Sequence, residues 1–223
     1  MNRLMVRTSK IIFVSHEFRP KRGGIATYIE ETLSALAKRD DVSVEAWYSG
    51  SRTCSSAGSN YAVKRISGCG NLDIFSLYLT AKFLIRHSRA VKEATLCLAE
   101  PGPILAYLLP LTSRIPKPKR LVLVLHGSEI LRIASNRYYR AGFPGLLKSA
   151  HVIGVVSKFT RGLLEKYFPG HLERVVLVPG ALRSDLKFRP DRCMHSPECG
   201  LVRLLSLARM HRRKGFHHVI QAL

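Results

Sequence analysis

Short apolar runs rich in β-branched residues alternate along this chain with segments of helical apolar spacing. Continuous apolar runs are typical of strands buried on both faces, and strand–helix alternation places such strands parallel in one sheet. The sequence therefore predicts an α/β, Rossmann-like, doubly wound domain. The predicted strands are 11–14, 42–48, 61–66, 94–99, 121–125, 152–156 and 175–178, and the predicted helices are 25–38, 74–87, a stretch after Pro103, 145–150 and 158–168.

Ligands of doubly wound sheets bind beyond the carboxyl ends of the strands. The loops expected to form a binding site are therefore 15–24, 99–103, 126–136 and 156–158. In the last of these, Ser157 occupies the position of an N-cap before the helix predicted at 158–168.

The domain is expected to cover residues 1–190, followed by a linker to about residue 200. Pro190 and Pro197, together with mixed charges, are typical of such a linker. A further apolar run at 201–207 and a helical pattern from residue 215 predict the first strand and helix of a second Rossmann-like domain, left incomplete at 201–223.

Charge is the unusual part of the composition. The chain has 36 Lys and Arg against 15 Asp and Glu, a formal net charge of +21, which favours anionic partners. No apolar run reaches the roughly 18–20 residues of a membrane span. The run at 11–14 is shorter than the roughly 7–15 apolar residues of a secretory signal, so a cytoplasmic location is expected.

Cysteine usage agrees with that location, because five Cys without a signal indicate reduced thiols. Cys193 and Cys199 lie six positions apart, outside the spacing of common zinc motifs, with no second Cys/His pair nearby. We expect no metal site.

Two familiar nucleotide-binding motifs are missing. G-x-x-x-x-G-K-[ST] is absent, and Gly68-x-Gly70 is followed by Asp73 where a dinucleotide site has a small residue. The first predicted strand leads instead into Gly23-Gly24 at a helix start. Glycines permit close approach of a ligand, and a helix N-terminus favours an anion. The alternative is that Gly23-Gly24 forms a turn whose backbone conformation needs two glycines and has no role in binding.

Two further segments can carry chemistry. His126 directly follows the strand 121–125 and is expected to face the ligand crevice, although it could instead bind backbone groups of a turn. Arg209 and Lys214 follow the run 201–207 and could bind a diphosphate. A solvated basic turn and a nucleic-acid patch are the alternatives for Arg209 and Lys214.

Five segments in consistent order resemble the N-terminal part of a GT-B glycosyltransferase of the family-4, or glycosyl transferases group 1, type. They extend over nearly the whole chain and include the start of the C-terminal domain. The segments are HEFRPKRGGIATYIEETLSALAKR, LVLVLHGSEI, VIGVVSKFTRGLLEKYF, VVLVPGAL and LVRLLSLARMHRRKGFHHVIQAL.

The resemblance implies an enzyme that moves a hexosyl group from a nucleotide-sugar to a glycan or lipid-linked acceptor, usually with retention, in polysaccharide biosynthesis. The donor would bind between two Rossmann-like domains. Gly23 and Gly24 would approach its phosphates, and His126 would contact the transferred sugar as the catalytic residue. Arg209 and Lys214 would neutralise the leaving diphosphate.

On the acceptor side we place Glu100, at the end of a predicted strand, and Glu129. The resemblance implies no cofactor and no metal, because the nucleotide-sugar is a substrate and cations take the place of a metal ion. Oligomeric state cannot be predicted from these residues.

The sequence departs from the family pattern in two places. The usual P-N-G-V-D turn reads Pro179-Gly-Ala-Leu-Arg183, without its Asn and Asp. The family's E-x7-E region would lie well past Lys214, which only nine residues follow. The resemblance therefore predicts a truncated chain that is inactive alone; the alternative is a non-catalytic sugar-nucleotide-binding subunit of a split enzyme.

A basic segment at 114–120 precedes a predicted strand and should lie on the side opposite the crevice. Phosphate chemistry does not explain it. Because each Lys or Arg near an anionic membrane contributes about 1 kcal/mol, peripheral association with the inner membrane face is a hypothesis, against a merely solvated surface. A nucleic-acid-binding protein is the rival class, but no helix-turn-helix, RNP or zinc signature is visible, so no nucleic acid is expected.

Overall fold

The fold is that of a computed structural model, which describes residues 9–18, 23–50, 60–68, 70–180, 204–206, 208 and 212–222. The chain divides into two compact units, Met1–Ser184 and Asp185–Leu223, and each is described by itself. The first unit holds the sheet and the cleft discussed below.

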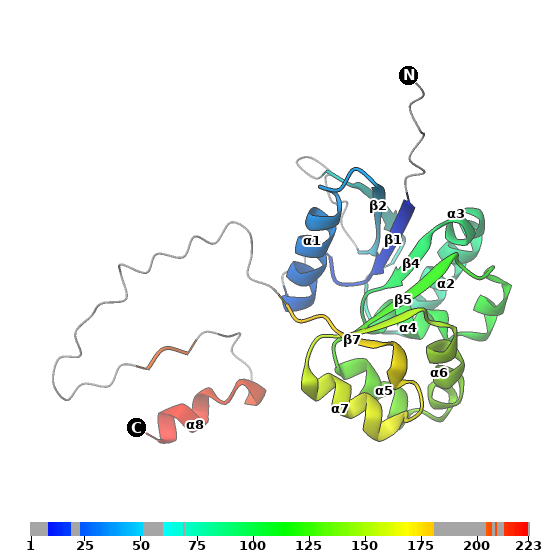
Figure 1. The fold of residues 1–223 in the computed structure, drawn as a ribbon. Helices are drawn as coiled ribbons and strands as arrows, with labels where there is room; N and C mark the ends of the chain where they lie inside the picture. The colour runs from blue at the N-terminus through cyan, green and yellow to red at the C-terminus, as the bar shows by residue number, and fades with distance from the viewer. Residues whose placement is uncertain are drawn as a thin grey trace. The chain divides into compact units, whose positions relative to one another are not determined.

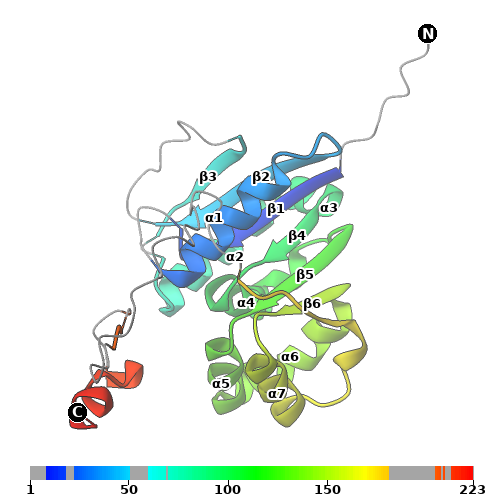
Figure 2. The same cartoon turned by 60° about the vertical axis from the view of Figure 1, so that its left-hand side comes forward.

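The first unit is built on one seven-stranded sheet with the order β3-β2-β1-β4-β5-β6-β7 (Figures 1 and 2). Every neighbouring pair is parallel. This confirms the predicted α/β, doubly wound fold. The strands are β1 (Ser9–Ser15), β2 (Val42–Ser49), β3 (Ala62–Ile66), β4 (Thr95–Leu98), β5 (Arg120–Leu125), β6 (Val152–Val155) and β7 (Val175–Leu177).

Helices cover both faces of the sheet. In the first unit they are α1 (Gly24–Leu36), α2 (Ile74–Arg86), α3 (Ser88–Glu93), α4 (Pro101–Tyr107), α5 (Ser128–Ser135), α6 (Arg137–Ser149) and α7 (Lys158–Tyr167), with the 3-10 turns η1 (Pro110–Arg114) and η2 (Leu172–Arg174). The second unit contains η4 (Arg212–Lys214) and α8 (Phe216–Gln221).

Two apolar cores follow from the alternation of side chains along each strand. On one face, Ile12 and Val14 of β1 belong to a core that also takes buried side chains from α2, α4, α5, α6 and α7. On the other face, Phe13 packs with Ile29 and Leu33 of α1. The sheet is therefore buried on both sides at β1, as its continuous apolar sequence requires.

Helix starts agree with the sequence where capping residues are present. The Ser157 Oγ accepts a hydrogen bond from the backbone N–H of Thr160 at 3.1 Å, which confirms the predicted N-cap of α7. Asp73 caps α2 in the same way, through the N–H of Ser76 at 2.9 Å.

Two predicted boundaries between 126 and 150 are wrong. Residues 126–136 are not all loop, because α5 begins at Ser128 after Gly127, whose φ of 111° opens the turn. The next helix begins at Arg137 instead of 145, capped by Asn136, and it continues through Pro144. Burial of Phe143 and its neighbours on α6 outweighs the backbone hydrogen bond that proline removes.

The second unit agrees with the sequence only in its helix. α8 lies inside the predicted helical segment from residue 215. The predicted strand at 201–207 does not form at 204–206, and its other residues lie outside the described part of the chain. Across the described residues, no helix combines the length and apolarity that crossing a membrane requires.

Candidate functional site

A cleft of about 350 Å³ opens at the carboxyl edge of the sheet, beside β1 and β4. The loop after β1, the turn before α2 and the first residues of α4 and α5 contribute to it. This is where a doubly wound sheet binds its ligand. The lining residues are His16, Glu17, Ile25, Gly70, Asn71, Leu72, Glu100, Pro101 and Ser128.

Glu100 follows β4 and, beside this cleft, binds the backbone of the loop that follows β1. Its side chain is 2% exposed, and one carboxylate oxygen accepts the backbone N–H groups of His16 and Glu17, the second at 3.2 Å. The Ser15 hydroxyl lies 3.4 Å from the same oxygen. Burial raises the pKa of Glu100 to about 7, the negative charge of Glu17 adds to that rise, and the backbone donors oppose it.

His16 is buried beside Glu100, and sequence reasoning missed it. Its Nε2 lies 2.8 Å from the Thr80 Oγ1 and its Nδ1 lies 3.2 Å from the carbonyl oxygen of Asn71. The ring fills the space above Gly102, where an added Cβ would lie 2.3 Å from Nδ1. The alternation pattern of the strand ends at Ser15, so only its place in a carboxyl-edge loop could have marked His16.

Gly23 and Gly24 begin α1, but their surroundings differ. A Cβ on Gly23 would lie 3.3 Å from a carboxylate oxygen of Glu17, whereas a Cβ on Gly24 would have no heavy atom within 4 Å. The backbone of Gly23 is extended, with φ −175°, so no strained conformation demands glycine there. The open side of this helix start is therefore at Gly24.

His126 follows β5 and is half-buried. Its Nε2 lies 3.1 Å from the carbonyl oxygen of Ala99, and because a carbonyl only accepts, Nε2 carries the proton. Burial lowers the pKa of His126, against the opposing effect of the Ala99 carbonyl, so the ring is neutral at pH 7. Nδ1 is then an acceptor, and it has no hydrogen-bond partner among the described residues.

Tyr28 of α1 positions the His126 ring and was also missed from the sequence. The two rings meet edge to face, with centroids 5.5 Å apart and an interplanar angle of 89°. The Tyr28 hydroxyl donates to the carbonyl oxygen of Val178 at 3.3 Å. Tyr28 therefore links α1 to the ends of β5 and β7; its place three residues after Ile25 on the apolar side of a predicted helix was the available signal.

Glu129 is fully buried at the start of α5. Its carboxylate accepts the backbone N–H of His126, and the Ser128 Oγ lies 3.4 Å from its second oxygen. Burial raises the pKa of Glu129. Glu129 is not among the residues that line the cleft, and its contacts fix the turn that carries His126.

The predicted site residues are thus only partly brought together. Glu100 lines the cleft, and Ala99, the residue before it, anchors His126. Arg209 lies outside the described residues, and Lys214 belongs to η4 of the second unit. Their predicted contacts with a diphosphate stay predictions.

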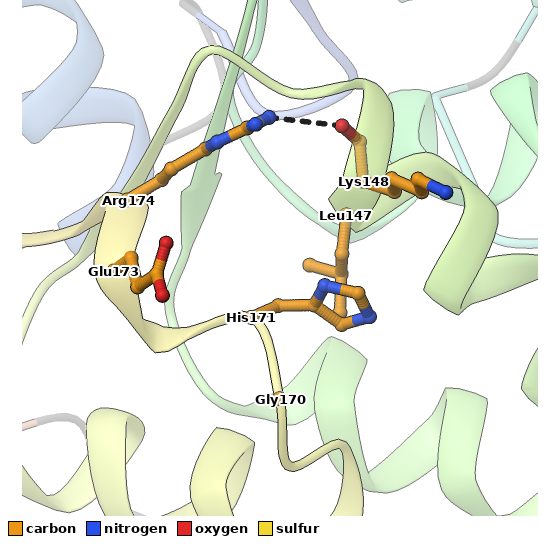
Figure 3. Close-up of a pocket in the computed structure, with 6 residues that line it drawn as sticks. All are labelled: Leu147, Lys148, Gly170, His171, Glu173 and Arg174. Atoms are coloured by element: carbon orange, nitrogen blue, oxygen red, sulfur yellow. Dashed lines mark hydrogen bonds between the residues drawn. The ribbon is translucent and has the colours of Figure 1, made fainter.

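A second, smaller hollow of about 100 Å³ lies at the opposite edge, next to the starts of β6 and β7 (Figure 3). Arg174 crosses it and donates from Nη1 to the carbonyl oxygens of Lys148 and Ala150, both at 2.9 Å. A cation at the last carbonyls of α6 stabilises that helix end. We interpret this hollow as part of the packing between α6 and η2.

No protein-family model matches the chain, and no curated protein matches it either. Within the described ranges, no three His, Cys, Asp or Glu side chains are grouped so that they could hold a metal ion.

The contact between His16 and Gly102 predicts a large effect of one methyl group. Gly102→Ala should lower the free energy of unfolding by about 1–3 kcal/mol, because the Cβ would displace the buried His16 ring. Gly145→Ala on α6 is the matched control: its Cβ has no neighbour within 4 Å, so it should be neutral or stabilising by up to about 1 kcal/mol. Urea denaturation measures both, and equal effects would contradict the contact.

The raised pKa of Glu100 predicts a pH-dependent stability. The folded state holds this proton more tightly than the unfolded state, whose Glu titrates near 4.5. Measured against Glu100→Gln, the wild-type free energy of unfolding should be highest below pH 4.5, fall by on the order of 3 kcal/mol up to pH 7, and then level. Parallel pH profiles of wild type and variant would refute this. Glu173→Gln, in the 3-10 turn η2, serves as the control.

Proposed function

We propose that the first unit is the acceptor-side domain of a GT-B glycosyltransferase that transfers a hexosyl group from a nucleotide-sugar to a glycan or lipid-linked acceptor. The observation that carries the proposal is the state of His126 at the carboxyl end of β5. Its Nε2–H is held by the Ala99 carbonyl and its ring by Tyr28, so neutral Nδ1 is available to accept a hydrogen bond. Sugar hydroxyls are donors of the required kind.

The proposed chemistry needs little from the protein beyond positioning and charge. Glycosyl transfer passes through an oxocarbenium-like state with a departing diphosphate. Gly24, with open space at the N-terminus of α1, is the proposed approach to the donor phosphates. Arg209 and Lys214 remain the proposed partners of the leaving group, and the proposed outcome is retention.

The proposal predicts that His126 contacts the hexose of the donor and not its nucleotide. Across a panel of nucleoside-diphosphate hexoses, the wild-type chain should bind the best hexose donor more tightly than the matching nucleoside diphosphate. His126→Ala should weaken hexose-donor binding about tenfold, a loss of about 1.4 kcal/mol, and leave nucleoside diphosphate binding unchanged. Isothermal titration calorimetry measures both constants.

His171→Ala, in the hollow at the opposite edge, is the control and should change neither constant. Equal loss for donor and diphosphate in His126→Ala, or no donor binding by the wild type, would refute the proposal. Duplex DNA serves as the rival ligand and should bind only with the steep salt dependence of simple charge attraction.

We further propose that the protein associates peripherally with an anionic membrane through the outward face of α2. Three apolar side chains on its first two turns are exposed, Ile74 by 67%, Phe75 by 65% and Tyr78 by 45%. Lys82 and Arg86 continue the same face at four-residue spacing and are also exposed. Apolar side chains beside cations suit the boundary between headgroups and acyl chains.

The basic segment 114–120 extends this proposed surface. The 3-10 turn η1, which ends at Arg114, packs against α2, and Lys117, Lys119 and Arg120 are exposed where β5 begins. The segment therefore lies at the amino edge of the sheet, as the sequence predicted. No acidic residue occurs between 114 and 120 to offset its charge.

This second proposal predicts salt-sensitive binding to phosphatidylglycerol vesicles. The double variant Lys82→Glu and Arg86→Glu should weaken binding at least tenfold, since each cation contributes about 1 kcal/mol. Phe75→Ser should lower the amount of protein that stays bound to the vesicles at high salt. The charge-matched control is Lys148→Glu with Lys166→Glu, away from α2, and vesicle co-sedimentation is the measurement. Equal losses in both double variants would overturn the assigned surface.

A further inference from the structure

The chain leaves the sheet at Val178, directly after β7, and several contacts hold this residue in place. Its backbone N–H donates to the carbonyl oxygen of Val155 on β6 at 2.8 Å. Its own carbonyl oxygen accepts the hydroxyl of Tyr28 at 3.3 Å. Its side chain packs against the core on the α1 face of the sheet. The point at which the chain departs from the sheet is therefore fixed by β6 on one side and by α1 on the other.

Gly154 of β6 makes room for the Val178 side chain. An added Cβ on Gly154 would lie 2.7 Å from Val178 Cγ2, well inside the roughly 3.5–4.0 Å at which carbon atoms pack. The backbone of Gly154 does not have a positive φ, so its conformation does not require glycine. A glycine inside a strand commonly marks close approach by another part of the chain. Here it allows the Val178 side chain to lie across β6.

Tyr28 connects this exit point to His126. The Tyr28 hydroxyl binds the Val178 carbonyl, and its ring meets the His126 ring edge to face with the centroids 5.5 Å apart. Burial raises the pKa of the Tyr28 hydroxyl, which therefore stays protonated and donates at neutral pH. Because a tyrosine ring is rigid, a displacement of its hydroxyl also moves the part of the ring that contacts His126.

The backbone of His126 is fixed independently of Tyr28. Its N–H donates to the Glu129 carboxylate, and its carbonyl oxygen accepts the Thr160 hydroxyl at 3.4 Å. The ring, by contrast, is held by the Ala99 carbonyl at Nε2 and by Tyr28. A shift of Tyr28 should therefore turn the His126 ring while the turn that carries it stays in place.

We propose that the contact of Val178 with β6 positions the ring of His126 through Tyr28, so that the direction in which the chain leaves the sheet sets the orientation of the histidine. Closely packed interiors transmit displacements along chains of touching groups. Gly154 and Val178 are then positioning residues that lie away from the ring they orient. The coupling itself does not depend on what His126 binds; its consequence for a hexose rests on the proposed function.

The test follows the ring signals of His126 in NMR spectra of the full chain with isotope-labelled histidine, identified by their loss in His126→Ala. Gly154→Ala should shift these signals, because the new Cβ displaces Val178. Adding Val178→Ala to Gly154→Ala should restore them, because truncation removes the clashing Cγ2. Gly162→Ala on α7 is the matched control: its Cβ would meet nothing within 4 Å, so the His126 signals should not move.

Tyr28→Phe separates a transmitted displacement from a general disturbance of the fold. The phenyl ring still lies beside His126 but cannot bind the Val178 carbonyl, so Gly154→Ala should shift the His126 signals far less in this background than in the wild type. If Gly154→Ala does not fold, as judged by circular dichroism, Val178→Ala alone takes its place. The gap that it leaves over Gly154 should shift the signals in the wild type and not in Tyr28→Phe.

The inference is overturned if the folded variant leaves the His126 signals in place, if its effect is equal in the Tyr28→Phe background, or if Val178→Ala does not restore the signals of Gly154→Ala. Under the proposed function, Gly154→Ala should also weaken hexose-donor binding and leave nucleoside diphosphate binding unchanged. Coupled His126 signals together with hexose-donor binding that is unchanged in His126→Ala would instead refute the proposed function alone.

Discussion

The contact between the buried Glu100 side chain and the loop after β1 is the interaction on which the carboxyl edge of the sheet depends. It follows β4, and it holds the backbone of the loop that follows β1, so two adjacent strands end at one fixed point. Removing a carboxyl from water is costly, and the raised pKa of Glu100 reflects that cost. The backbone donors that oppose it would otherwise be orphaned at the end of the sheet. One side chain thus satisfies the backbone N–H groups of both His16 and Glu17.

A second buried carboxyl group makes the same kind of backbone contact at the end of the neighbouring strand β5. Glu129, buried at the start of α5, accepts the N–H of His126 and holds the turn after β5. In both turns a buried acid binds backbone N–H groups, and the side chain of Glu17 or His126 beside it takes no part in that contact. The acids therefore hold the backbone of the two turns, and the sugar contact that we propose belongs to His126.

The fold could be predicted because its signal is repeated and local. The interior strands β1, β4, β5 and β6 contain short continuous apolar runs, and both faces of β1 are covered. The residues of the candidate site were harder to predict from the sequence. The position of His126 after β5 followed from topology, whereas His16 and Tyr28 depend on contacts with Gly102 and with the end of β7, which no local spacing encodes. The extent of α6 was missed for a related reason, since tertiary packing overrides the preference of Pro144.

The strand order also governs how the chain can assemble as it is synthesised. β1 lies in the interior of the sheet, where it pairs with β2 on one side and with β4 on the other, Ile11 opposite Thr95. The side of β1 that pairs with β4 therefore stays open until β4 has left the ribosome. Long-range parallel pairing is slow, and an open apolar edge invites association with other chains. During the interval between translation of β2 and β4, β1 consequently has a strand partner on one side only.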